Sequence, residues 1–417
     1  MFPKDWQRST LGKIAQITSG GTPDRANADY WDGDVPWVTT GEIQFNTING
    51  TLEKITELGL KNSAAKRFPV DTLLMAMYGQ GKTRGQVAKL GIEAATNQAC
   101  AAILLRDGYD TDFYFQYLSF QYEALRELGN AGTQQNLSGG ILKMVPVPIL
   151  PLKEQRRIAN ILTTWDKVIA STERLIANSL RQKKMLAQRM LTGKVRLQGF
   201  STSVIRRETP YGSLPEDWAY LRIEEVAVEV SQKLGDVAPY PVLSCTKHHG
   251  LVDSLNYFKK QVFSLDTSTY KVIPKNCFVY ATNHIDEGSI GYQNLYDFGL
   301  VSPMYTSFKT NDNILDSYLF ALLKTEHYRQ IFASATNASV DRRGSLRWKD
   351  FRKLHIPVPS ISEQKAIAKV LVLADRDADL MQRKLDLLRK EKSALMTQLL
   401  TGKRRVHLSD SETVVSA

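Results

Sequence analysis

The sequence predicts an α+β protein that contains one architectural unit twice. Each unit is a globular domain followed by a long helix, and the two helices are expected to pack as an antiparallel coiled coil related by a pseudo-twofold axis. Three observations predict this fold: two long segments of matching sequence, a heptad pattern in both, and short strand-like apolar runs before each.

The first observation is an internal repeat. Residues 154–196 align with residues 363–405 without a gap, at an offset of 209 residues, and 14 of the 43 positions are identical. Each copy follows a proline-punctuated run, VPVPILP or IPVPS, and ends on a basic sequence, LTGKVR or LTGKRR. The starts of the two units also match, since PKDW at residues 3–6 resembles PEDW at residues 215–218. Two copies of about 210 residues are too few and too long for a solenoid.

The repeated segments are predicted to be helical. They contain no proline, and their glycines stand only at Gly193 and Gly402, where glycine can terminate a helix. Apolar residues recur at alternating spacings of three and four, which is typical of a coiled-coil seam. The residues expected in this seam are Leu162, Trp165, Ile169, Ile176, Leu186, Leu371, Met381, Leu385, Leu388 and Leu395. The alternative is two separate helices that each lie on their own domain.

The regions before the helices have the pattern of mixed α and β structure. Residues 8–148 and 220–356 contain short apolar runs separated by glycine, asparagine, aspartate and proline. Strands are expected at residues 35–39, 72–78, 100–105, 240–244 and 277–281, and helices near residues 111–128 and 315–332. The predicted division is a first globular domain 1–149, a helix 150–193, a linker 194–214, a second globular domain 215–356, a helix 357–402, and a basic and then disordered tail 403–417.

The positive charge of the chain is concentrated in the helical segments. The net charge is +11 at pH 7. Residues 150–207 hold 13 Lys and Arg against 3 Asp and Glu, and residues 357–405 hold 11 against 6, whereas residues 1–149 hold 14 against 15. A polyanionic partner such as DNA is therefore expected, because basic side chains that neutralise phosphates release bound counterions.

Composition argues against several other classes of protein. No apolar stretch of about 18 residues exists, so no transmembrane helix is expected. The first ten residues, MFPKDWQRST, lack the apolar core of a secretory signal, which predicts a cytoplasmic protein. Cys100, Cys245 and Cys277 form no CxxC pair, so we expect three buried thiols and neither a disulfide framework nor a metal site.

Several motifs together resemble one known family. The sequence SGGTPDRANADYWDGDVPW at residues 19–37 is similar to the opening signature of the target-recognition domains of type I restriction–modification specificity subunits. Further similar stretches are LLMAMYGQGKTRG at 73–85, ATNQAC at 95–100, GLVSPMY at 299–305, and the two proline-run, EQ, long-helix and LTGK units. The resemblance covers nearly the whole chain, from Trp6 to Arg405. The second copy lacks an SGGTP-like opening, which indicates a different recognition subgroup.

The resemblance implies a function and a set of partners. Such a chain would be a non-catalytic subunit of a phage-defence complex that reads a bipartite, asymmetric site on double-stranded DNA, with one domain per half-site. It would bind two methylation subunits and the restriction–translocation subunits, and its helices would set the gap between the half-sites. No cofactor would be bound by this chain, since S-adenosylmethionine, ATP and magnesium would be used by partner subunits. The alternative is a coiled-coil scaffold whose domains bind protein without sequence-specific DNA recognition.

Other chemistries are less well supported by the residues. Residues 76–83, AMYGQGKT, match a loose phosphate-loop pattern, but the residues that follow predict a turn and a strand where a phosphate loop needs a helix. The chain contains no Pro-Pro dipeptide, and adenine methyltransferases use Asn/Asp-Pro-Pro-aromatic to hold a flipped base. The pair His248 and His249 is more typical of a polar or base-contacting loop than of a metal site. We therefore expect no catalytic residue in this chain.

Polar, aromatic and basic loop residues are the candidates for DNA contact, because base edges are read by hydrogen bonds and phosphates by cations. In the first domain the candidates are Thr39, Thr40, Tyr78, Gln80, Lys82, Arg84, Asn97, Gln98, Gln134, Gln135 and Asn136. In the second domain they are Lys247, His248, His249, Asn283, His284 and Tyr305. Residues Arg342, Arg343, Arg347 and Lys349 are expected to form a phosphate clamp shortly before the second helix.

Overall fold

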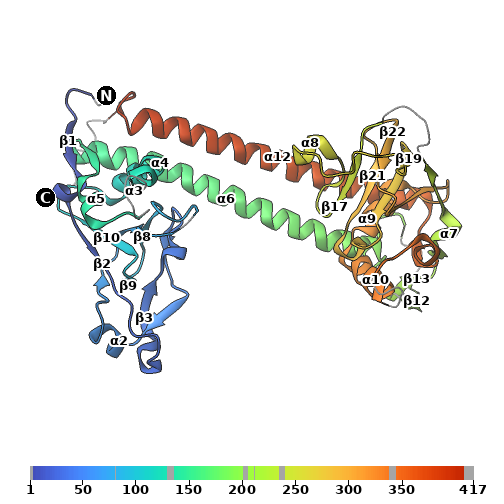
Figure 1. Ribbon diagram of the computed structural model, residues 1–417, viewed down its shortest axis with the longest axis horizontal. Helices are drawn as coiled ribbons and strands as arrows, with labels where there is room; N and C mark the ends of the chain where they lie inside the picture. Colours follow the sequence, from blue (N-terminus) through green and yellow to red (C-terminus); the bar gives the residue numbers. More distant parts are fainter. Residues whose placement is uncertain are drawn as a thin grey trace. The chain divides into compact units, whose positions relative to one another are not determined.

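A computed structural model describes residues 3–79, 81–128, 136–200, 205–210, 212–233, 240–337 and 344–407. The chain divides into two compact units: unit 1 consists of Met1–Glu173 and Arg383–Ala417, and unit 2 of Arg174–Gln382. The division falls within both long helices, so each unit contains one globular domain and part of each helix (Figure 1).

Unit 1 contains two β-sheets that share a core. One sheet has five strands in the order β2-β10-β7-β8-β4, and the other has four in the order β5-β3-β9-β6. Most neighbours are antiparallel, and β4–β8 and β3–β9 are parallel. The strand bounds are β2 Ala15–Ser19, β3 Trp31–Val38, β4 Thr47–Ile48, β5 Glu53–Ile55, β6 Arg67–Phe68, β7 Leu73–Ala76, β8 Val87–Leu90, β9 Ala94–Thr96 and β10 Cys100–Leu105.

Strand β7 shows why the five-stranded sheet is covered on both faces. Leu73 and Met75 lie in one apolar core, whereas Leu74 and Ala76 lie in a second core shared with the four-stranded sheet. Successive side chains of a strand point to opposite faces, so an uninterrupted apolar run indicates burial on both sides. Helix α3 covers the first face and is followed by α4. The helices of this domain are α1 Leu11–Ile14, α2 Glu57–Lys61, α3 Thr111–Phe120, α4 Tyr122–Leu128 and α5 Gly139–Met144.

Unit 2 repeats this plan with different sequences. A four-stranded sheet has the order β15-β23-β20-β21, a three-stranded sheet has the order β16-β19-β22, and β17 and β18 form a hairpin. Along β20, Phe278 and Tyr280 lie in the main core and Val279 in a second core, which is the alternation seen in β7. The strand bounds are β15 Ala227–Glu229, β16 Gln232–Lys233, β17 Leu243–Thr246, β18 Gly250–Asp253, β19 Lys271–Pro274, β20 Cys277–Ala281, β21 Ile290–Gln293, β22 Phe298–Val301 and β23 Tyr305–Thr310. The helices are α7 Ile223–Val226, α8 Ser254–Phe258, α9 Asp316–Leu323, α10 Glu326–Asn337 and α11 Trp348–Phe351.

The predicted elements agree with this fold, with differences in their bounds. The expected strand at residues 240–244 begins only at Leu243, and the expected helix in each domain is two helices in sequence. The segment expected to be a linker, 194–214, includes β12 (Arg206–Thr209) and most of β13 (Gly212–Pro215), which pair antiparallel. Of the expected tail, residues 408–417 lie outside the described residues.

The proline-punctuated runs are short strands that join the two ends of each domain. Strand β1 (Gln7–Thr10) pairs with β11 (Pro146–Ile149), and β14 (Ala219–Arg222) pairs with β24 (His355–Val358). Proline lacks a backbone N–H donor and is tolerated here because both strands of a two-stranded sheet are edge strands. Each pairing brings the start of a domain to the start of the helix that follows it.

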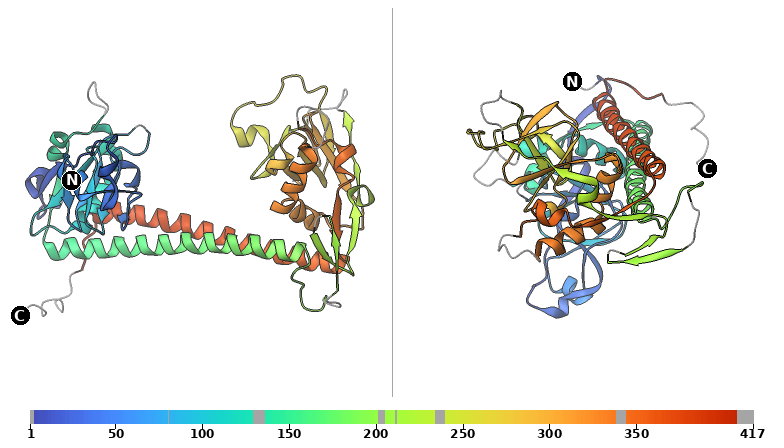
Figure 2. Two further views of the ribbon diagram at one scale, coloured as in Figure 1. Left: turned by 90° about the horizontal axis from the view of Figure 1, so that it is seen from below. Right: turned by 90° about the vertical axis from the view of Figure 1, so that its right-hand side faces the viewer.

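The long helices are α6 (Leu152–Leu191) and α12 (Ile361–Leu399), and they run antiparallel within each unit (Figures 1 and 2). In unit 1, Lys392 Nζ lies 2.5 Å from Asp166 Oδ1. In unit 2, Lys183 pairs with Asp375. Asp375 is the counterpart of Asp166, and Lys392 is the counterpart of Lys183, each 209 positions further along the chain. The repeat therefore forms the same ion pair twice, once in each unit.

The predicted seam between the helices is buried or half-buried at nine of its ten residues. Leu162, Ile176, Leu371 and Leu385 are buried, and the remaining members are half-buried apart from Leu186. The prediction for Leu186 is wrong, because its side chain is 37% exposed. Ala187, next to it, packs against the core of unit 2 instead. None of the described helices is long and apolar enough to cross a membrane.

In each unit a cluster that we call a clasp closes the helix pair. The unit 1 clasp consists of Asp5, Trp6, Glu154 and Arg405. Trp6 Nε1 donates to Glu154 Oε2 at 3.3 Å, and Arg405 Nε donates to Glu154 Oε1 at 2.7 Å. Arg405 Nη1 also donates to Asp5 at 2.7 Å. Residues near the two ends of the chain are thereby joined to the start of α6.

The unit 2 clasp consists of the corresponding residues Asp217, Trp218, Glu363 and Arg196. Trp218 Nε1 donates to Glu363 Oε2 at 3.1 Å, and Arg196 Nε donates to Glu363 Oε1 at 2.7 Å. Arg196 Nη1 donates to Asp217 Oδ1 at 2.8 Å. In each unit the glutamate of an EQ motif therefore contacts the arginine that lies two residues after an LTGK motif.

Candidate nucleic-acid interface

The candidate residues of the first domain come from loops that meet at one end of the two sheets. The loop between β7 and β8, residues 77–86, is joined to the loop between β9 and β10, because Met77 N donates to Ala99 O at 2.9 Å. Leu137 N donates to Met77 O at 3.0 Å, which brings the segment before α5 to the same place. Asn97 N donates to Val38 O at 3.0 Å, which adds the end of β3. Residues separated by up to a hundred positions thus form one polar surface.

Four of these candidates present exposed side chains: Tyr78, Lys82, Gln98 and Asn136. Gln98 accepts a hydrogen bond from the Thr22 hydroxyl, so the SGGTP segment borders this surface.

Three further candidates, Thr39, Thr40 and Asn97, are half-buried and partly engaged within their own loops. Thr39 is hydrogen-bonded to the Glu42 carboxylate, at 2.7 Å through its backbone nitrogen, and Asn97 Oδ1 accepts from Ala99 N at 3.1 Å. These contacts define the shape of the loops. Gln80, Gln134 and Gln135 lie outside the described residues.

Arg84 does not lie where we expected it. Its side chain is 7% exposed, and Nη2 donates to Arg126 O at 3.4 Å. The alternation of polar and glycine residues in this loop gives no sign of which side chains turn inward. Arg84 therefore belongs to the support of the loop and not to its exposed surface.

Tyr122 and Arg126 are residues of this site that the sequence did not single out. Both lie on α4 and contact backbone carbonyls of the 77–86 loop. They are about 40 positions away from that loop and carry no local motif. Only the fold brings them to it.

The corresponding loops of the second domain also meet. Thr282 Oγ1 donates to Met304 O at 2.9 Å, and Leu346 N donates to Thr282 O at 2.8 Å. The loop between β20 and β21 therefore adjoins the loop between β22 and β23 and the segment before α11. The hydrogen bond from Leu346 N to Thr282 O is equivalent to the one from Leu137 N to Met77 O in the first domain. Both domains therefore join these two segments in the same way.

A cavity of about 440 Å³ lies among these loops and is lined by Tyr305, Arg347 and Lys349. Lys271 Nζ also lines it and donates to Tyr305 O at 2.6 Å. Burial lowers the pKa of Lys271 and raises that of Tyr305. Of the residues expected to form a phosphate clamp, Arg347 and Lys349 are exposed, and Arg342 and Arg343 lie outside the described residues.

Asn283 and His284 are exposed in the β20–β21 loop, where His284 Nδ1 lies 3.2 Å from Glu287 Oε1. Lys247, His248 and His249 form the exposed turn of the β17–β18 hairpin. His248 and His249 line a different cavity, of about 620 Å³, together with parts of α6, α9 and α12 in unit 2. The second-domain candidates thus fall into two groups.

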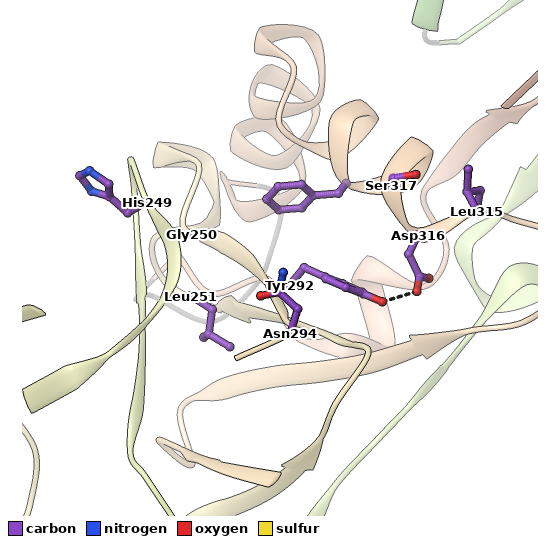
Figure 3. Close-up of a pocket in the computed structure, with 9 residues that line it drawn as sticks. His249, Gly250, Leu251, Tyr292, Asn294, Leu315, Asp316 and Ser317 are labelled. Carbon is purple, nitrogen blue, oxygen red and sulfur yellow. Dashed lines mark hydrogen bonds between the residues drawn. The ribbon is translucent and has the colours of Figure 1, made fainter. Parts of the chain in front are cut away.

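A third cavity, of about 510 Å³, begins at the same hairpin (Figure 3). His249 stands at its edge, and Tyr292 Oη donates to Asp316 Oδ2 at 2.5 Å across it. Burial and this carboxylate raise the pKa of Tyr292. Asp316 also accepts a hydrogen bond from the Thr310 hydroxyl, and it begins α9, so its carboxylate ties a helix start to the sheet.

The loop that matches a phosphate-loop pattern is followed by a strand. Residues 76–83 lead into β8, Val87–Leu90, which pairs antiparallel with β7. No helix start faces the loop from the following segment, so the backbone lacks the arrangement that such a loop uses to bind phosphates.

Comparison with known proteins places this geometry in one family. The sequence model described as "Type I restriction modification DNA specificity domain" matches residues 3–180 and 215–390. The type I restriction enzyme MjaIX specificity subunit of Methanocaldococcus jannaschii is 28% identical over 178 residues, which are 42% of this chain and 40% of that protein. The MjaVIII specificity subunit of the same organism is 23% identical over 426 residues, which are 97% of this chain and 94% of that protein. The crystal structure of a type I restriction–modification S subunit from M. genitalium has a TM-score of 0.54 at 16% identity, covers 97% of both chains, and shows the same fold.

Proposed function

This chain belongs to the family of type I restriction–modification DNA specificity domains, and from that membership we propose that it selects the DNA sequence on which a type I restriction–modification complex acts. Each globular domain reads one half of a bipartite, asymmetric site on double-stranded DNA. The observation that carries the proposal is that the family model matches both halves of the chain, and that both halves gather equivalent loops at one end of their sheets. A protein-binding scaffold that ignores DNA sequence is not favoured by this match.

The exposed loop residues supply the chemistry that such reading needs. We assign DNA contact to Tyr78, Lys82, Gln98 and Asn136 in the first domain, and to Asn283, His284, Arg347 and Lys349 in the second. Amide side chains recognise base edges, and cations bind phosphates. The first domain therefore offers Gln98 and Asn136 for contact with base edges, and the second adds the cations Arg347 and Lys349 for contact with phosphates. The half-buried Thr39, Thr40, Asn97 and Tyr305 shape the loops around them.

The same membership supports our proposal for the partners. The chain binds methylation subunits and restriction–translocation subunits, two of each, and works in the cytoplasm with its DNA. It carries out no chemistry itself. S-adenosylmethionine, ATP and magnesium serve the partner subunits. The repeat supports two equivalent docking sites, because each unit contains the same antiparallel helix pair.

The decisive experiment is a map of methylated adenines. The chain is produced with its methylation subunits, and a genome that lacks its own methylation is sequenced after exposure to the complex. We expect methylation at one bipartite sequence. A second complex, in which residues 8–148 are exchanged for the first domain of another family member, should change one half of that sequence and leave the other half and its spacing intact. Methylation without sequence preference, or an exchange without effect, would refute the proposal.

A further inference from the structure

One loop in each domain is held by an arginine from the helix that lies beside it. In unit 1 this is the β7–β8 loop, residues 77–86. Arg126 Nη2 donates to Gly81 O at 2.6 Å, and Tyr122 Oη donates to Lys82 O at 2.5 Å. Arg126 Nη1 also donates to Tyr122 Oη at 3.2 Å. Two neighbouring carbonyls of the loop are thus bound by two side chains that also bind each other.

In unit 2 the β20–β21 loop, residues 282–289, is held in an equivalent way. Arg329 Nε donates to Asp286 O at 3.0 Å, and its Nη1 lies 2.8 Å from Glu326 Oε2. Lys324 Nζ donates to Gly288 O at 2.8 Å and reaches Lys247 O at 3.1 Å. Arg329 lies near the start of α10, as Arg126 lies in α4, although the two domains have different loop sequences.

The next-to-last residue of each loop is a glycine that lies beside the arginine stem. Gly85 has φ of +83°, and a Cβ there would lie 3.2 Å from Arg126 Cγ. Gly288 has φ of +92°, and a Cβ there would lie 3.7 Å from Arg329 Cδ. Glycine adopts this backbone conformation without the steric cost that other residues have. The same pairing of a left-handed glycine with an arginine stem therefore occurs in each domain.

The two loops carry four of the exposed candidates for DNA contact, Tyr78 and Lys82 in the first and Asn283 and His284 in the second, and contacts from neighbouring helices help to hold their conformation. Lys82 and Tyr78 flank two glycines, Gly79 and Gly81, both at positive φ. Glycine has wide conformational freedom, and the groups of a binding site must be held within about 0.5 Å to discriminate between ligands. Hydrogen bonds from a charged donor are stronger than neutral ones. The Arg126 guanidinium is directed at Gly81 O and Tyr122 Oη, so in this arrangement its contribution to DNA reading is to place the loop.

We propose that Arg126 and Arg329 are positioning residues for sequence selection, each for the half-site that its own domain reads. This inference rests on the proposed function of the chain. Selectivity in one half-site depends on an arginine that contacts loop carbonyls from a neighbouring helix. Loss of one arginine then relaxes one half-site and spares the other.

The test uses the complex of the full chain with its methylation subunits, and a duplex library in which both half-sites are randomised. Methylated molecules are sequenced for the wild type and for Arg126→Ala, Arg126→Lys, Arg329→Ala and Arg329→Lys. For Arg126→Ala we expect discrimination to fall by roughly tenfold, or about 1.4 kcal/mol, in the half-site assigned to the first domain by exchange of residues 8–148. The other half-site keeps its preference, and Arg329→Ala shows the reverse. Each lysine variant recovers part of the loss, because an ammonium can still donate to one carbonyl.

A milder variant keeps the test valid if an alanine variant does not fold. Tyr122→Phe removes only the hydroxyl that donates to Lys82 O and accepts from Arg126, and it should relax the first half-site by about twofold to fivefold. Equal relaxation of both half-sites by Arg126→Ala, or wild-type selectivity in Arg126→Ala and Tyr122→Phe complexes that assemble normally, overturns the inference. A wild-type complex without preference at either half-site refutes the proposed function instead.

Discussion

A substitution in the unit 2 clasp would measure how much the Arg196–Glu363 ion pair stabilises the contact between the globular domain and the helices. Replacing Arg196 with alanine removes the charged partner of Glu363, whose side chain is 2% exposed. The Glu363 carboxylate would keep one neutral donor, Trp218 Nε1 at 3.1 Å. Breaking a buried ion pair by removing one partner costs about 3–5 kcal/mol, because the remaining charge stays out of water. We expect Arg196→Ala to lower the local stability of unit 2 by about that amount.

The matched control is the same change in the unit 1 clasp. The Arg405 side chain is 45% exposed, whereas that of Arg196 is 9% exposed, although both make bidentate contacts with a buried glutamate. Water can replace part of what Arg405 provides, so Arg405→Ala should cost about 1–2 kcal/mol. A second control is Arg196→Ala combined with Glu363→Gln. The neutral amide removes the unpaired charge and should recover about 1–3 kcal/mol.

Native-state hydrogen exchange is the suitable assay, because a chain of two units does not guarantee a single unfolding transition. The protection of amides in β14 and in the first turns of α12 reports the free energy of opening at the unit 2 clasp. Equal costs for Arg196→Ala and Arg405→Ala would show that burial does not set the strength of the clasps. Failure of the added Glu363→Gln change to recover stability would show that the unpaired carboxylate is not the cause.

Two further predictions concern the seam and the cysteines. Leu385→Ala, at a position 3% exposed, should destabilise the helix pair by about 2–5 kcal/mol, whereas Leu186→Ala, at a position 37% exposed, should cost less than about 1 kcal/mol. Native-state hydrogen exchange of the α6 and α12 amides in each unit measures these costs, and similar costs would contradict the seam described above. Burial raises the pKa of Cys100 and Cys245 to about 12 and that of Cys277 to about 11. At pH 8 the folded chain should therefore react with a thiol reagent at least about a hundredfold more slowly than the urea-unfolded chain. Rapid labelling of the folded chain at any cysteine would contradict this.

The elements of the fold were largely predictable because their signals are local. The helices at 152–191 and 361–399 follow from the absence of proline and from the three-and-four spacing, and β7 follows from the run LLMA. The pattern misplaced Leu186, which is 37% exposed, whereas its counterpart in the repeat, Leu395, packs against the core of unit 1. In unit 2 the neighbouring Ala187 packs against the core instead. The candidate site was less predictable. Its loops could be located, but the sequence does not show which of their side chains face outward.

Sequence alone determined that the chain is one unit repeated, that long helices follow two mixed domains, and which family the motifs resemble, since each of these depends on residue order and spacing. Tertiary structure decided that the EQ and LTGK motifs meet as clasps, that Arg84 is buried, and that Arg126 and Arg329 hold the loops. Glu154 and Arg405 are 251 positions apart, and Gly81 and Arg126 are 45 apart. No local pattern encodes such pairs, because a hydrogen bond depends on the distance between two atoms after folding and not on their separation along the chain.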